Sequence, residues 1–247
     1  MRTAERRVRG TTRPDRSIVL CGSQRVGSTV LCDLLTTTGR LGHPKEYFLD
    51  DARSAFVRAW GLPADVDDAT FLERAAVDGT SPNGVFAAKV MADQLGTLDR
   101  VTAGRGLHAL PRPHAVLLTR RDKVAAAVSQ WRAEVTGAWS SDRPPAEGPD
   151  PASADLGRIG VLHDRKHAEE ARWRDRLAAD GLPWFAATYE EWAPDPLVLV
   201  ERVAAAVGAD LRGTSPTTDL RPQRDEVNEE VAARWAADAG GCAACGV

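Results

Sequence analysis

A glycine-bounded loop between an expected strand and an expected helix constrains this chain more than any other stretch. Residues 18–21 are a short apolar run typical of a buried strand. The segment from Gly22 to Gly27 follows, and apolar residues at helical spacing then lead to Gly39, which suits a helix C-terminus. Backbone N–H groups of such a loop and helix face an anion, so the stretch predicts a site for a phosphate-like group.

The loop lacks the lysine of nucleoside-triphosphate enzymes. Their motif is G-x-x-x-x-G-K-[ST], and the lysine position here holds Ser28. That lysine contacts the β- and γ-phosphates, so its absence argues against an ordinary kinase or NTPase. Arg25 supplies a basic group three residues earlier. We therefore predict a loop for a phosphate-like group without a triphosphate.

Further apolar segments continue the alternation of strands and helices. We expect strands over 85–91, 114–119 and 184–189, and the main helices over 122–139, 155–180, 196–208 and 225–239. The alternation predicts an α/β fold in three layers, with helices on both faces of a mostly parallel central sheet. Right-handed crossovers would place the glycine loop at the carboxyl edge of that sheet, where such sheets bind ligands.

The composition of this 247-residue chain limits the kinds of partner that it can bind. Six arginines make residues 1–16 strongly basic, and no apolar stretch of a secretion signal accompanies them. We expect a disordered basic arm over 1–16 and a single domain over 17–240. The net charge of −3 provides no field for nucleic acid, and no apolar run is long enough to span a membrane.

Neither the cysteines nor the histidines predict a metal site. Two of the four cysteines, Cys21 and Cys32, lie in the first strand and helix, where free cysteine behaves as a small hydrophobe. The other two form a lone C-x-x-C in a glycine- and alanine-rich tail, Cys242 to Cys245. Two histidines have i, i+4 spacing, but their charged neighbours favour a solvated helix face: His163 and His167 among Arg165, Lys166, Glu169 and Glu170. We expect a metal-free cytoplasmic protein.

A second basic position lies at the end of the third expected strand. Arg120 would leave the same carboxyl edge as the glycine loop, and Ser129 lies in the helix that follows. Two neighbouring anion sites suit a doubly phosphorylated nucleotide, whereas the alternative is a surface arginine beside a helix-packing face. The apolar stripe expected for this helix is Val124, Val128, Trp131, Val135 and Trp139.

Four motifs resemble, in the same order, those of bacterial sulfotransferases and most closely the trehalose 2-sulfotransferase family. They are Ser23–Thr29, Gly42-x-Pro-x-Glu-Tyr-Phe48, Lys89-x-Met91 and Arg120 to Ala133. The resemblance implies the P-loop-like sulfotransferase fold and transfer of a sulfonate from 3′-phosphoadenosine-5′-phosphosulfate (PAPS) to a hydroxyl. A carbohydrate or glycosylated small molecule would be the acceptor, with trehalose as one candidate. It also implies a homodimer and no metal.

The resemblance assigns roles to matching positions. The 5′-phosphosulfate would lie in the loop, on Ser23, Gln24, Arg25, Val26, Gly27, Ser28 and Thr29, and the 3′-phosphate on Arg120 and Ser129. Glu46 matches the general base, which takes the proton of the acceptor hydroxyl. Its neighbours Tyr47 and Phe48 are expected to shield it partly from water. Arg25 would stabilise the charge that develops on the departing bisphosphate.

Two departures from the family pattern leave the acceptor less defined than the donor. After Lys89-x-Met91 the family has aromatic and amide residues, and here Ala92-Asp93-Gln94 keeps only the amide. Near the C-terminus Pro222 occupies the place of a basic residue, so Arg224 or Arg221 is the candidate to close over the donor. Two alternatives stay open: an ATP-dependent phosphotransferase with the same loop, and a non-catalytic nucleotide-binding protein.

Overall fold

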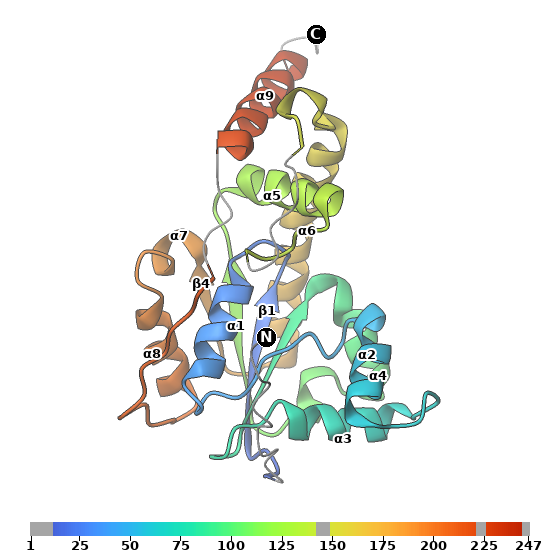
Figure 1. Cartoon of the computed structure of the whole chain (residues 1–247), viewed down its shortest axis with the longest axis vertical. Helices are drawn as coiled ribbons and strands as arrows, with labels where there is room; N and C mark the ends of the chain where they lie inside the picture. Colours follow the sequence, from blue (N-terminus) through green and yellow to red (C-terminus); the bar gives the residue numbers. More distant parts are fainter. Residues whose placement is uncertain (1–11, 142–148, 221–225, 244–247) are drawn as a thin grey trace, which may run out of the picture.

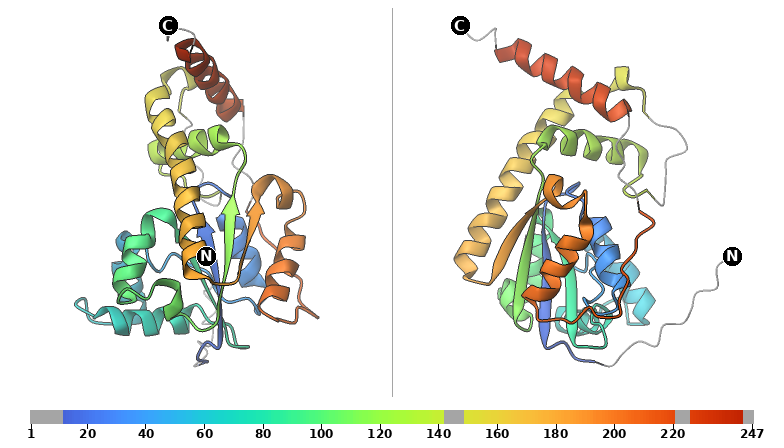
Figure 2. Two further views of the ribbon diagram at one scale, coloured as in Figure 1. Left: turned by 180° about the vertical axis from the view of Figure 1, so that it is seen from behind. Right: turned by 90° about the vertical axis from the view of Figure 1, so that its left-hand side faces the viewer.

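Four parallel strands form the centre of the molecule, in the order β2-β1-β3-β4. The computed structural model describes residues 12–141, 149–220 and 226–243, with side chains as far as 238. The strands are β1 (Arg16–Gly22), β2 (Val85–Met91), β3 (Pro113–Thr119) and β4 (Trp184–Thr188). Helices cover both faces of this sheet (Figures 1 and 2). The prediction of a three-layer α/β fold with a parallel sheet is therefore confirmed.

Alternate side chains of each strand enter two separate cores. Val19 and Cys21 pack with α2 (Asp50–Trp60), α3 (Asp68–Asp78), α4 (Leu95–Val101) and part of α6 (Leu156–Asp180). Ile18 and Leu20 face the opposite side, with α1 (Ser28–Thr37), α7 (Tyr189–Trp192) and α8 (Pro196–Ala206). Both faces are buried because covering helices leave neither side to water, which explains the continuous apolar runs.

A third cluster lies beyond the carboxyl edge of the sheet. It joins α5 (Lys123–Thr136), the first half of α6 and α9 (Glu226–Ala243) through Val128, Ile159 and Val231. Figures 1 and 2 show these helices extending past the ends of the strands. The space between this cluster and the sheet edge is where the strand-end loops emerge, so it is the place for a ligand.

Two expectations about α5 are wrong at its C-terminus. The helix ends at Thr136, because Gly137 adopts a left-handed conformation with φ of 70° and caps it. Val135 and Trp139 were expected in the apolar stripe, yet they are 60% and 44% exposed. The stripe holds for Val128 and Trp131, which are buried.

The ends of the chain are only partly described. β1 begins at Arg16, which lies in the expected basic arm, whereas 1–11 lie outside the described residues. Single-domain organisation over 17–240 stays a prediction. Within the described ranges, no helix combines the length and the apolar character that a bilayer crossing requires.

Candidate functional site

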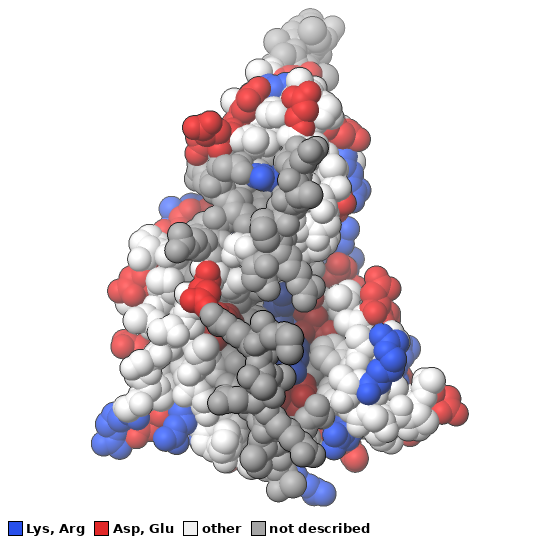
Figure 3. Space-filling model, viewed as in Figure 1, with Lys and Arg blue, Asp and Glu red and all other residues white. Residues whose placement is uncertain are grey.

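A cavity of about 760 Å³ lies at the carboxyl edge of the sheet. Its walls come from the loop after β1, the turn after β3, the start of α7, and helices α5, α6 and α9. Its lining includes Gln24, Arg25, Gly27, Ser28, Thr29, Glu46, Lys89, Arg120, Ser129, Gln130, Glu134 and Tyr189. Basic and acidic side chains gather together at the centre of the face seen in Figure 3. The cavity therefore offers both anion-binding and proton-accepting groups.

The N-terminus of α1 opens into this cavity. Gly27 caps the helix with φ of 79°, and no side chain caps it. The N–H groups of the first helical turn have no carbonyl partner within the helix, and Ser28 and Thr29 line the cavity. A Cβ atom on Gly27 would lie 2.7 Å from atoms of Trp192 and Tyr189, so the aromatic rings of α7 require glycine here. The loop thus has the anion-binding frame expected from the sequence.

The start of the loop is anchored from beneath. The indole Nε1 of Trp173, a fully buried residue of α6, donates to the carbonyl oxygen of Gly22 at 3.2 Å. A Cβ atom on Gly22 would lie 2.8 Å from the Leu118 carbonyl oxygen, so β3 also approaches closely. These contacts within the chain hold the start of the loop in place.

Arg25 and Ser129, predicted to hold two parts of one donor, are in direct contact. Arg25 Nε donates to Ser129 Oγ at 2.9 Å, and its Nη1 donates to the Trp139 carbonyl oxygen at 2.6 Å. Burial, with the nearby charge of Arg120, lowers the pKa of Arg25 to about 10. The structure therefore brings the arginine of the loop to the first half of α5.

Arg120 completes this basic group. Its Nη1 donates to the Arg25 carbonyl oxygen at 3.2 Å, and its guanidinium lies 5.0 Å from the centre of the Tyr189 ring. Glu190 fixes the turn on which Arg120 stands, because its carboxylate accepts from the backbone N–H groups of residues 121 and 122. Arg120, Arg25 and Ser129 thus form one cluster, as two adjacent phosphate sites require.

Glu46 lies in the same cavity but not in the surroundings expected for it. Tyr47 and Phe48 turn into the core, where each is 1% exposed, so they do not shield the carboxylate. Instead Glu46 Oε1 lies 3.1 Å from Lys89 Nζ. That oxygen is buried and has the Lys89 ammonium as its charged partner, so a substrate would reach the carboxylate at its other oxygen, Oε2.

Two of the expected loop residues do not line the cavity. Ser23 and Val26 are buried beneath the loop, at 7% and 2% exposure. Arg224 lies outside the described residues, as does its alternative Arg221. The roles of all these residues stay predictions.

Comparison with known proteins identifies the family. A model of the Stf0 sulphotransferase family matches residues 17–238. The chain is a member of that family. The resemblance of the four sequence motifs to those of sulfotransferases is therefore confirmed.

Relatives of the Stf0 chain extend over nearly its whole length. The trehalose 2-sulfotransferase of Mycobacterium tuberculosis (strain ATCC 35801 / TMC 107 / Erdman) is 28% identical, over 92% of this chain and 97% of that protein. The enzyme of the same name from Mycolicibacterium smegmatis is 29% identical, over 90% and 94%. A crystal structure of a sulfotransferase from Alicyclobacillus acidocaldarius matches with a TM-score of 0.52 at 18% identity, covering 93% and 94% of the two chains. This likeness shows the fold.

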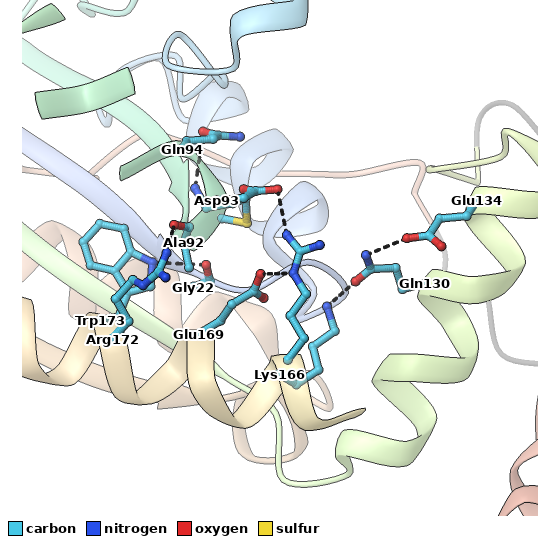
Figure 4. A network of polar contacts seen from close by, with 12 residues as sticks. Gly22, Ala92, Asp93, Gln94, Gln130, Glu134, Lys166, Glu169, Arg172 and Trp173 are labelled. Carbon is cyan, nitrogen blue, oxygen red and sulfur yellow. Dashed lines mark hydrogen bonds and ion pairs between the residues drawn. The ribbon is translucent and has the colours of Figure 1, made fainter. Parts of the chain in front are cut away.

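A polar network around two buried charged residues of α6 in this Stf0 chain was not predicted from the sequence. The expected solvated face of α6 is wrong for Lys166 and Glu169, which are 1% and 7% exposed. Lys166 Nζ donates to Gln130 Oε1, and Gln130 Nε2 donates to Glu134 Oε1 at 2.9 Å (Figure 4). The signal was their spacing, because both residues follow the helical period of the buried Leu162 and Trp173. The network supports the cavity wall, to which Gln130 and Glu134 contribute.

Replacement of Lys166 by methionine is expected to change how stability depends on pH. Burial lowers the pKa of the Lys166 ammonium from 10.5 to about 8. Between these values the unfolded chain holds a proton that the native protein releases, so a rising pH favours the native state. Relative to Lys166→Met, wild type should gain up to about 1.4 kcal/mol per pH unit in this window. Urea unfolding of both proteins across the window measures the difference, and a difference independent of pH contradicts the assignment.

The histidines and cysteines give no metal centre in the described part of the chain. No group of three or more His, Cys, Asp or Glu side chains there is placed to hold an ion. The His163 and His167 rings pack together at 4.9 Å, and His163 also packs on Trp235. Cys21 is buried, as expected, and Cys32 is partly buried. The side chains of the C-x-x-C tail lie outside the described residues.

Proposed function

We propose that this protein transfers a sulfonate from PAPS to a hydroxyl of a carbohydrate or glycosylated small molecule. The observation that carries the proposal is one cavity that holds the α1 N-terminus, the cluster of Arg25, Arg120 and Ser129, and the Glu46 carboxylate. Membership of the Stf0 family supports the reaction class. The two curated relatives are named for trehalose, which makes this sugar the first acceptor to test.

The donor would bind along the edge of the sheet. Its 5′-phosphosulfate suits the first-turn N–H groups at Ser28 and Thr29, where the helix dipole favours an anion. Its 3′-phosphate suits Arg120 and Ser129, since a guanidinium offers paired donors to phosphate oxygens. Arg25 lies between the two, with its carbonyl held by Arg120 and its side chain on Ser129. From there it would stabilise negative charge on the departing bisphosphate.

The transfer would proceed by in-line displacement. The acceptor oxygen attacks sulfur, while Glu46 takes the hydroxyl proton. An oxygen–sulfur bond forms to the acceptor, and the bond between sulfur and the bridging phosphate oxygen breaks. The electron pair of that bond leaves with the product adenosine 3′,5′-bisphosphate (PAP). The loop N–H groups and Arg25 stabilise the negative charge that develops on it. No step requires a metal ion.

Family resemblance also supports a homodimer, and the composition of the sequence favours a cytoplasmic protein, here one that acts on small molecules. Size-exclusion chromatography with light scattering would test the dimer. Neither nucleic acid nor membrane insertion is part of the proposal.

An acceptor screen tests the proposed function. Purified protein is incubated with PAPS and a panel of neutral sugars that includes trehalose, and mass spectrometry follows a gain of one SO₃ group. We expect a sulfated sugar and PAP in equal amounts. Thermal unfolding with PAPS or with Mg·ATP separates the alternatives, because a ligand stabilises the state that binds it. Stabilisation by Mg·ATP alone would favour a phosphotransferase, and PAPS binding without any product would favour a non-catalytic protein.

A further inference from the structure

Lys89 is the one charged residue of β2, and the reaction described above gives it no role. The other six residues of this strand are buried, from Val85 to Met91. Because side chains alternate along a strand, Lys89 lies on the same face as Val85 and Ala87, which pack on the α1 side of the sheet. Its side chain is 13% exposed and lines the donor cavity. Strand β2 is thus part of the core except at Lys89, whose ammonium lies at the cavity.

The partner of this cation is the general base itself. Lys89 Nζ lies 3.1 Å from Glu46 Oε1, and the two side chains are 13% and 22% exposed. Burying an ammonium group raises the free energy of the folded state, because the group loses its hydration. A buried ion pair therefore stabilises the fold little compared with apolar side chains that pack well. A purely structural role is therefore a poor account of a lysine at this position of β2. A ligand that carries negative charge would account for it.

Lys89 places a lysine in the cavity although the loop itself lacks the lysine of nucleoside-triphosphate enzymes. Ser28 stands where triphosphate enzymes carry that lysine, and the side chain of Arg25 is hydrogen-bonded to Ser129 and to the Trp139 carbonyl oxygen. Lys89 enters the cavity from the neighbouring strand, among residues that include Ser28 and Thr29. It is thus the lysine that shares this cavity with the α1 N-terminus and Glu46, among the described residues.

We propose that Lys89 is a catalytic residue whose ammonium binds the sulfonate oxygens of the donor. This inference rests on the proposed sulfonate transfer. Before reaction the charge of Lys89 is balanced by Glu46. When Glu46 takes the acceptor proton its negative charge is lost, and the ammonium then acts fully on the sulfonate that is in transfer. Lys89 stays protonated throughout, so the proton still goes from acceptor to Glu46. The attraction is strongest in the transition state, which is where it accelerates the reaction.

Lys89→Met tests this role by comparing two nucleotides that differ only in the sulfonate. Calorimetry without acceptor should show PAPS binding weakened about tenfold or more, as the loss of a charge-assisted contact predicts, and PAP binding changed less than about threefold. The turnover number should fall about 10²-fold. Lys89→Arg, which keeps the charge, should retain the preference for PAPS over PAP. Lys89→Gln, with a neutral polar side chain, repeats the test if the methionine variant does not fold.

Lys45→Met is the matched control. Lys45 lies on the segment that carries Glu46, pairs with Asp78 at 2.7 Å, is 47% exposed and does not line the cavity. It should leave turnover and both affinities unchanged. Equal weakening of PAPS and PAP by Lys89→Met, or turnover near the wild-type value, would overturn the inference and leave Lys89 at most a support of Glu46. A wild-type protein that binds PAP and PAPS but sulfates no sugar would instead count against the proposed function.

Discussion

Glu46→Gln is expected to reduce the turnover number by about 10²- to 10⁴-fold and to leave PAP affinity almost unchanged. The amide cannot accept the proton of the acceptor hydroxyl at neutral pH, so the attacking oxygen must lose it to water. The proposed contacts to PAP, which lacks the sulfonate, come from Arg25, Arg120, Ser129 and the α1 N-terminus, and none of these groups pairs with Glu46. Stopped assays that quantify PAP give the turnover number, and calorimetry gives the affinity.

Glu73→Gln is a suitable control for the loss of one carboxylate. Glu73 is an exposed residue of α3 that does not line the cavity. Its variant should turn over at the wild-type rate. If Glu46→Gln retains more than about a tenth of wild-type turnover, a loss well below that expected of a general base, Glu46 is not the base. If it loses PAP affinity as well, the carboxylate acts through the shape of the cavity.

Arg120→Ala is expected to weaken PAP by about 10²-fold and the 5′-monophosphate, AMP, by less than about threefold. Only PAP carries the 3′-phosphate that would pair with the guanidinium. Arg120 is 13% exposed and rests against the Tyr189 ring, so its head group is oriented before the nucleotide binds. Titration of each nucleotide into wild type and variant gives the four affinities needed.

Arg121→Ala controls for the loss of positive charge next to the site. Arg121 is 66% exposed and pairs with Glu191 at 2.6 Å, away from the cavity lining. Its variant should bind both nucleotides as wild type does. Equal losses for PAP and AMP on Arg120→Ala would show that Arg120 acts by holding the Arg25 carbonyl, and so the shape of the loop, rather than the 3′-phosphate.

The sheet and the loop could be predicted because their signals are local. Each strand is a short apolar run between turns, and β2 was predicted with its observed bounds, Val85–Met91. The glycines at 22 and 27 mark the loop because a backbone carbonyl and two aromatic rings approach them too closely for any side chain. Arg120 and Ser129 were expected near the loop because parallel strands end at one edge.

The surroundings of Glu46 could not be predicted, because they depend on partners distant in sequence. Lys89 is brought to Glu46 because the chain at Lys45 pairs with the free edge of β2, where the Lys89 N–H donates to the Lys45 carbonyl oxygen, and no spacing encodes that pair. Likewise Trp139, expected in an apolar stripe, contributes its backbone carbonyl to Arg25 because Gly137 turns the chain out of the helix. Lys166 was misjudged because a charged residue at a core position of a helix is uncommon.

Arg25 adopts a backbone conformation with φ of 69°, a left-handed geometry that costs a non-glycine residue about 1 kcal/mol. Two hydrogen bonds from its side chain and one to its carbonyl oxygen, all made within the chain, hold it there. The conformational entropy of the loop is therefore already lost when the protein folds, and the binding energy of an incoming nucleotide is not reduced by ordering it. Glycine at this position would relieve the backbone strain. It would also remove the side-chain hydrogen bonds that keep the loop in one conformation.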